Sequence, residues 1–205
     1  MINTTLCYIE KDGKYLMLHR IKKQNDLNQD KWIGIGGKFE DKESPEQCVR
    51  REAFEETGLV LGKCDYRGII TFVSDKWPTE YMHIFTCSDF NGELKECDEG
   101  DLQWVSRAFL YNLPMWEGDK IFLKLIETPC PFFSLKLVYD GDVLTGFSSM
   151  TYAKGAAGNG ISSYDVVAVD GNKLTVKYNV PGSSATGTVK TIYLSSNAKV
   201  FDISP

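Results

Sequence analysis

The segment from residue 36 to residue 60 constrains the fold more than any other part of the chain, because it predicts one capped helix in a fixed register. Ser44 suits the N-cap position, and Pro45 suits the first helical position. Gln47 completes an S-x-x-Q capping box. Gly58 is placed where a helix ends in a left-handed residue. The sequence therefore predicts a helix that begins at Ser44 and ends at Gly58.

One side of this predicted helix combines apolar residues with carboxylates. At about 100° per residue, Val49, Ala53 and Glu56 fall on one stripe. Glu52 lies beside the stripe, one turn from Glu56, and the two carboxylates repel each other unless a cation lies between them. Glu55 adds another carboxylate, and hard divalent cations take oxygen ligands of this kind and also bind phosphates. We therefore interpret this side as a metal site rather than as a solvated acidic face.

The residues around the helix complete a spaced motif. Gly36 and Gly37 allow the backbone to pass close to a ligand or to offer a carbonyl to a metal. Arg51 lies one turn before Glu55 and can orient it by a charge-assisted hydrogen bond. With its spacing, the segment reads Gly37, five residues, Glu43, seven residues, then Arg51-Glu52-Ala53-Phe54-Glu55-Glu56-Thr57-Gly58-Leu59. This resembles the Nudix box, G-x5-E-x7-R-E-U-x-E-E-x-G-U, at every fixed position.

The resemblance implies a fold, a metal and a set of ligands. The fold expected is of the α/β (α+β) class, an α/β/α sandwich with a mixed central sheet. The metal is Mg²⁺, with Mn²⁺ as the alternative, bound by Glu52, Glu55, Glu56 and the Gly36 carbonyl. In this family the loop before the later strand at Trp104 often adds a glutamate, and its offset favours Glu96, with Glu99 in reserve. The general base is expected to be Glu55 or Glu96.

Composition limits the other classes of function. The net charge of −5 argues against non-specific binding to a nucleic-acid polymer but leaves a free nucleotide with metal possible. Six cysteines without a C-x-x-C pair indicate free thiols in a reducing compartment. The sequence contains no apolar run suited to a signal peptide or a membrane span, so we expect a cytoplasmic protein without membrane contact.

The periodicity of the chain divides it into three parts. Residues 1–150 are expected to form the hydrolase domain, 151–163 a flexible linker, and 164–205 a small β-rich extension of unknown role. The extension is expected to contact the main domain or to mediate oligomerisation, because about fifty residues is near the lower limit for independent folding. Within the first part we expect strands at 4–9, 15–18, 66–73 and 82–87, helices at 109–113 and 119–127, and a closing hairpin of 132–138 with 142–147.

A second resemblance concerns the substrate. Met115-Trp116-x-x-Asp119, followed by an apolar helix, is similar to the MutT-type 8-oxo-dGTP diphosphatases. That resemblance implies that Trp116 stacks on a purine and that Asp119 bonds the base edge. The branch has an asparagine where this chain has Ile33, which leaves the base preference open. The substrate-binding set expected is Thr5, Arg20 (on phosphate), Ile33, Gly36, Gly37, Lys38, Trp116 and Asp119.

The predicted function follows from the metal site and this pocket. We expect hydrolysis of 8-oxo-dGTP, or a related oxidised purine nucleoside triphosphate, to the monophosphate and pyrophosphate, as in nucleotide pool sanitation. One alternative is a Nudix hydrolase of another nucleoside diphosphate derivative, such as a sugar nucleotide or a dinucleoside polyphosphate. The other is a non-catalytic nucleotide sensor, which would have no need of the complete glutamate set.

Overall fold

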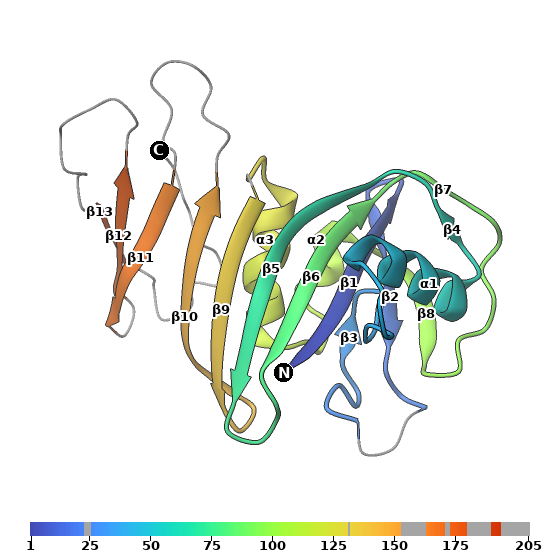
Figure 1. Ribbon diagram of the computed structural model, residues 1–205, viewed down its shortest axis with the longest axis horizontal. Helices are drawn as coiled ribbons and strands as arrows, with labels where there is room; N and C mark the ends of the chain where they lie inside the picture. The colour runs from blue at the N-terminus through green and yellow to red at the C-terminus, as the bar shows by residue number, and fades with distance from the viewer. Residues whose placement is uncertain (23–25, 131, 153–162, 171–172, 180–189, 194–205) are drawn as a thin grey trace. The chain divides into compact units, whose positions relative to one another are not determined.

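The computed structural model describes residues 1–22, 26–130, 132–152, 163–170, 173–179 and 190–193 (Figure 1). It divides into two compact units, the first made of Met1–Arg67 with Glu80–Glu117 and the second of Gly68–Thr79 with Gly118–Pro205. Most of the predicted linker, residues 153–162, lies outside the described residues, as do residues 180–189 and 194–205 of the predicted β-rich extension.

The first unit is built on a mixed sheet, as the sequence predicts. Strand β1 (Ile2–Lys11) is parallel to β6 (Glu80–Cys87) and antiparallel to β2 (Lys14–His19). The β1–β2 hairpin turns at Asp12 and Gly13, whose φ values of 50° and 72° suit the predicted Asp-Gly turn. Strand β2 also pairs with β3 (Trp32–Ile33) and β8 (Asp101–Ser106), and the short β4 (Val60–Leu61) pairs with β7 (Phe90–Asn91).

Helix α1 (Pro45–Thr57) has both predicted caps. The Gln47 backbone N–H donates to the Ser44 hydroxyl at 3.3 Å, and the Ser44 N–H donates to the Gln47 side chain at 2.9 Å. Gly58 ends the helix with φ 79°. The apolar face of α1 lies over β1 (Figure 1) and completes one buried core. This core includes Cys7, Ile9, Leu16, Leu18, Ile33, Ile35, Val49, Ala53, Leu59, Leu61, Phe85 and Cys87. A short helix, α2 (Arg107–Leu110), follows β8.

The strands of the second unit pair in both parallel and antiparallel directions. Strand β5 (Cys64–Ser74) begins in the first unit, and its residues 68–74 pair in parallel with β9 (Phe132–Asp140). The predicted closing hairpin is present as β9 and β10 (Val143–Tyr152), and the ladder continues antiparallel through β11 (Ser163–Asp170), β12 (Lys173–Asn179) and β13 (Lys190–Tyr193). Helix α3 (Glu117–Glu127) buries Phe122, Leu123 and Ile126.

In the part of the chain that the structure describes, no helix has the length and apolar character needed to span a membrane.

Candidate active site

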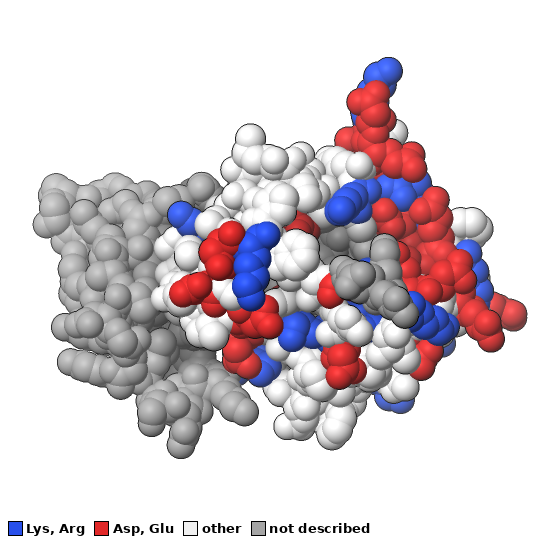
Figure 2. All heavy atoms as spheres, turned by 90° about the horizontal axis from the view of Figure 1, so that it is seen from below, with Lys and Arg blue, Asp and Glu red and all other residues white. Residues whose placement is uncertain are grey.

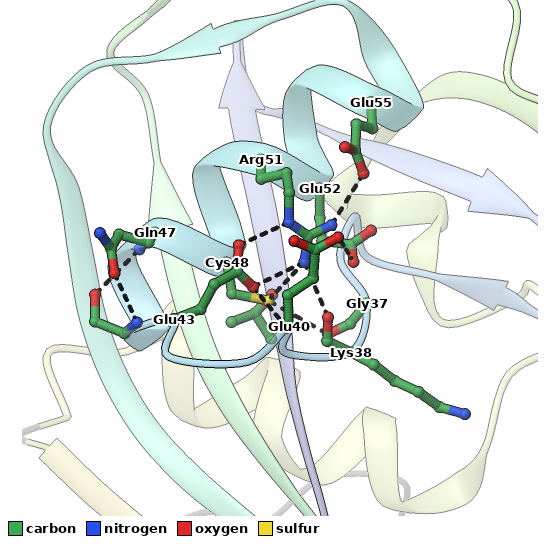
Figure 3. Close-up of polar contacts among 11 residues, drawn as sticks. Gly37, Lys38, Glu40, Glu43, Gln47, Cys48, Arg51, Glu52 and Glu55 are labelled. Atoms are coloured by element: carbon green, nitrogen blue, oxygen red, sulfur yellow. Dashed lines mark hydrogen bonds and ion pairs between the residues drawn. The ribbon is translucent and has the colours of Figure 1, made fainter.

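Helix α1 places one guanidinium among three carboxylates. Arg51 bonds Glu43 through two nitrogens, with Nε–Oε1 at 2.7 Å and Nη2–Oε2 at 2.9 Å. Its Nη1 donates at 2.9 Å to both Glu52 and Glu55, and Nη2 also donates at 3.0 Å to the Lys38 carbonyl (Figure 3). The Arg51 hydrogen bonds hold the pKa of Glu43 at about 2, so Glu43 stays charged. Arg51 therefore orients the helix carboxylates and ties them to the preceding loop.

Glu52 lies directly against the glycine loop. A Cβ on Gly37 would be 2.4 Å from the Glu52 carboxylate, so a side chain at Gly37 could not fit without moving it. Burial raises the pKa of Glu52, while the contact with Arg51 partly offsets that rise. Because desolvation disfavours a charged carboxylate, a cation beside Glu52 would stabilise its ionised form.

Glu56 contacts the same loop one residue earlier, at Gly36. Its side chain is buried, and its Oε2 accepts from the Gly36 backbone N–H at 3.0 Å. The loop lies close to β1, because a Cβ on Gly36 would be 2.1 Å from the Thr5 carbonyl oxygen. The Thr5 N–H also donates to the Gly37 carbonyl at 2.9 Å. Glu52 and Glu56 thus lie beside successive glycines of one tightly held loop.

Sequence reasoning missed one residue of this arrangement, Cys48. Its thiol is buried, lies 3.4 Å from the Thr5 hydroxyl and donates to the Gly37 carbonyl at 3.7 Å. Burial raises the pKa of Cys48 to about 11, so it remains a neutral thiol. The signal was available, because Cys48 is one helical turn before Glu52 on the buried side of α1. Thr5, which we assigned to the substrate pocket, lies here beside the glycine loop.

A buried arginine contacts the acidic loop before β8. Arg20 is 7% exposed and bonds Asp26, with Nε–Oδ2 at 2.7 Å, and also Glu99. Glu96, our first choice for an added ligand, is exposed. The Arg20 guanidinium, which we predicted on a phosphate, therefore contacts two carboxylates. The contact of Arg20 with Glu99 joins residues 79 positions apart, so no local pattern indicates it.

The residues predicted to bind the base are divided between the two units. Trp116 is 8% exposed, its indole N–H donates to the Asn28 side chain at 2.8 Å, and Lys31 Nζ lies 4.4 Å from its ring centre. Asp119 is buried on α3 in the second unit. Ile33 is buried in the core of the first unit. Lys38 is exposed, and its side chain extends away from the carboxylates (Figure 3).

The carboxylates of α1 are suitable ligands for a hard divalent cation. In this structure they do not converge on one point. Within the described residues, no three His, Cys, Asp or Glu side chains are close enough to hold a metal together. Glu55 bonds Arg51, but 54% of its side chain is exposed. It can therefore leave Arg51 and turn toward a cation. Figure 2 shows Asp and Glu side chains gathered on the side of the first unit that carries α1. Such a surface repels a polyphosphate unless cations accompany it.

Comparison with known proteins agrees with this geometry. The model of the NUDIX domain matches residues 2–126. An uncharacterised Nudix hydrolase of Bacillus subtilis, YvcI, is 33% identical over 56% of this chain and 72% of its own length. The oxidized purine nucleoside triphosphate hydrolase of Danio rerio is 33% identical over 60% of this chain and 77% of its own length.

A solved structure gives the same answer for the fold. The MutT protein of Bacillus halodurans superposes with a TM-score of 0.65 and 26% identity, over 73% of this chain and 97% of that one. The predicted α+β fold is therefore confirmed. Nudix hydrolases generally use divalent metal ions. From the matched domain, the capped glutamate helix and these relatives, we conclude that the chain belongs to the Nudix hydrolase family, where its likeness is to MutT-type members.

Proposed function

We propose that this protein hydrolyses 8-oxo-dGTP, or a related oxidised purine nucleoside triphosphate, to the monophosphate and pyrophosphate. One observation carries the proposal: Glu52 and Glu56 of α1 lie beside Gly37 and Gly36. The loop formed by these two glycines approaches β1 closely. The printed name of the Danio rerio relative supports the substrate class. The MutT likeness supports the reaction type.

Mg²⁺ is the proposed metal, and Glu52, Glu55, Glu56 and the Gly36 carbonyl are the residues proposed to hold it. When bound, the metal polarises a phosphoryl oxygen and neutralises charge on the leaving pyrophosphate. Arg51 would keep Glu52 oriented while Glu55 turns, because its bonds to Glu43 do not depend on Glu55. The proximity of Gly37 to the Glu52 carboxylate supports a close approach of the loop to the metal.

The water that attacks phosphorus needs a base, and two glutamates remain candidates. Glu55 is half exposed and lies next to Glu52 through the shared Arg51. Glu96 is exposed on the loop before β8, whose Lys95 N–H bonds the Thr57 carbonyl at the end of α1. Replacing each by Gln and following the acidic limb of the pH–rate profile distinguishes them, because only the base's own substitution removes that limb.

Trp116 is the proposed stacking residue for the base, and Asp119 the proposed partner of its edge. The Asn28 hydrogen bond fixes the plane of the Trp116 ring, which supports a stacking role. Lys31 already lies over one face of the ring, so a base would replace Lys31 or use the other face. For Arg20 to bind phosphate, phosphate must displace Asp26 or Glu99.

One observation favours a second candidate, a Nudix hydrolase of another nucleoside diphosphate derivative. Ile33 is apolar and packed in the core, so it offers a base no hydrogen bond. The discrimination expected from a polar partner at this position is then absent.

Cytoplasmic location, and docking or oligomerisation through residues 164–205, also remain predictions.

A substrate panel tests the proposal. With Mg²⁺ and the full chain, we expect kcat/KM for 8-oxo-dGTP to exceed that for dGTP by about tenfold or more, or ~1.4 kcal/mol in transition-state binding. The panel should include methylated purine triphosphates, CTP, a sugar nucleotide and a dinucleoside polyphosphate, with released phosphate and pyrophosphate both measured. Preference for a sugar nucleotide would establish the second candidate. Calorimetric binding without any product would instead identify a sensor.

A further inference from the structure

Two cysteines of the first unit lie opposite each other across an antiparallel pair of segments. Strands β4 and β7 pair with Leu61 opposite Phe90. The same register, continued from Leu61 to Cys64 and from Phe90 back to Cys87, places the two cysteines opposite each other. The register is maintained around this point, because the Gly62 N–H donates to the Asp89 carbonyl at 2.7 Å. Beyond it, the rings of Tyr66 and Phe85 stack at 4.7 Å.

This placement suits a covalent link between the two sulfurs. Directly opposed residues of an antiparallel pair have Cα atoms roughly 4.5–5.5 Å apart. Disulfides join Cα atoms roughly 4.4–6.8 Å apart, so the backbone need not move. The Cys87 thiol reaches across to the opposite segment, where its sulfur lies 3.4 Å from the carbonyl oxygen of Lys63, the residue before Cys64. The same sulfur lies 3.1 Å from the Asp89 carbonyl oxygen of its own segment.

The pair is also chemically prepared for oxidation. The neighbouring Cys64 thiol lowers the pKa of Cys87 to about 7, so Cys87 is the more readily ionised member of the pair. Arg50, which bonds the Leu61 carbonyl, adds positive charge nearby. Cys64 is partly exposed whereas Cys87 is 2% exposed, so an oxidant meets Cys64 first.

We propose that Cys64 and Cys87 are an oxidative modification site that forms a reversible disulfide with hydrogen peroxide. The Cys87 thiolate takes the Cys64 proton as the Cys64 sulfur attacks one peroxide oxygen. The O–O bond breaks, leaving a sulfenic acid on Cys64 and a hydroxide ion, which removes the Cys87 proton to form water. The Cys87 sulfur then attacks the Cys64 sulfur and displaces hydroxide, which leaves as a second water after taking a proton from solvent.

The atoms and electrons balance across these steps. Two thiols and one hydrogen peroxide give one disulfide and two waters, so both cysteines are oxidised and the peroxide is reduced. The link closes the chain between residues 64 and 87, which restricts the unfolded state and stabilises the folded one. A dithiol such as dithiothreitol reverses it by thiol–disulfide exchange. None of this depends on which nucleotide the protein hydrolyses.

The test uses the full chain, treated with about a tenfold molar excess of hydrogen peroxide, blocked with iodoacetamide and mapped by mass spectrometry. We expect a Cys64–Cys87 linked peptide, a loss of two hydrogen atoms from the intact mass and a higher melting temperature, all reversed by dithiothreitol. Cys130→Ser, a control in the second unit, should leave the linked peptide unchanged, whereas Cys64→Ser should abolish it.

The wild-type map alone decides the question if a variant fails to fold. Full carbamidomethylation of both cysteines after peroxide, or a sulfinic acid at either one without a linked peptide, would overturn the proposal. Because the readout is mass and melting temperature, failure here is separate from failure of the proposed hydrolysis.

Discussion

Two regions of the first unit that we connect with substrate differ in how they are built. The carboxylate region is built on one capped helix. Its contacts outside the helix come from the short segment just before it, at Gly36 and Glu43. The region around Trp116 joins separate loops, with Asn28 and Lys31 contacting a ring far along the chain. Rigid elements position groups more precisely than loops do, and loops vary more freely. The difference suggests that the reaction depends on α1 and that base preference depends on the loops.

The largest effect is expected at the carboxylate region. Glu56→Gln keeps an oxygen that accepts from the Gly36 N–H but removes the charge proposed to bind metal. We expect kcat to fall by roughly a thousandfold or more, about 4 kcal/mol, with an unchanged circular dichroism spectrum. Glu46→Gln, on the exposed first turn of the same helix, is the matched control and should retain activity. Normal turnover by Glu56→Gln would remove Glu56 from the metal site.

The next largest effect tests the glycine loop. In Gly37→Ala the new Cβ would lie 2.4 Å from the Glu52 carboxylate, so loop or carboxylate must shift. We expect kcat/KM to fall about a hundredfold, and the free energy of unfolding to decrease by roughly 1–3 kcal/mol, the usual effect of overpacking. Gly146→Ala, which meets no atom within 4 Å, should change neither. Equal behaviour of the two variants would show that the close approach is unimportant.

A smaller effect is expected on the base side. Trp116→Ala should raise KM for purine nucleotides about tenfold, because stacking on an aromatic residue contributes roughly 1–3 kcal/mol per base. We expect kcat to change less, since the carboxylate region is untouched. Asn28→Ala should raise KM less than this, because it frees the ring plane without removing the ring. An unchanged KM in Trp116→Ala would exclude Trp116 from the pocket.

The smallest effect concerns pH and stability rather than turnover. The pKa of Glu43 is lowered from 4.5 to about 2 by Arg51, so this group stabilises the fold above pH 4.5 and loses that contribution as pH falls toward 2. Arg51→Met should therefore flatten the decline of unfolding free energy between these pH values, as measured by denaturant titration. A slope identical to that of the wild type would show that Glu43 is not held by Arg51.

The same contrast explains which features the sequence could predict. The caps of α1, the Asp12-Gly13 hairpin and the closeness of Arg51 to Glu55 all depend on residues within a few positions of each other. Contacts such as Arg20 with Glu99 join positions that only the folded sheet brings together. The burial of Ile33 in the core has the same origin, because it depends on packing against α1 and β1.

The central claim is that the α1 glutamates hold a divalent cation beside the glycine loop. Anomalous diffraction from crystals soaked with Mn²⁺ and a non-hydrolysable nucleoside triphosphate tests it most directly. We predict one or more Mn²⁺ peaks in contact with Glu52 or Glu56 and with the triphosphate, with Glu55 turned away from Arg51. Mn²⁺ bound elsewhere, with these carboxylates still bonded as they are here, would contradict the account.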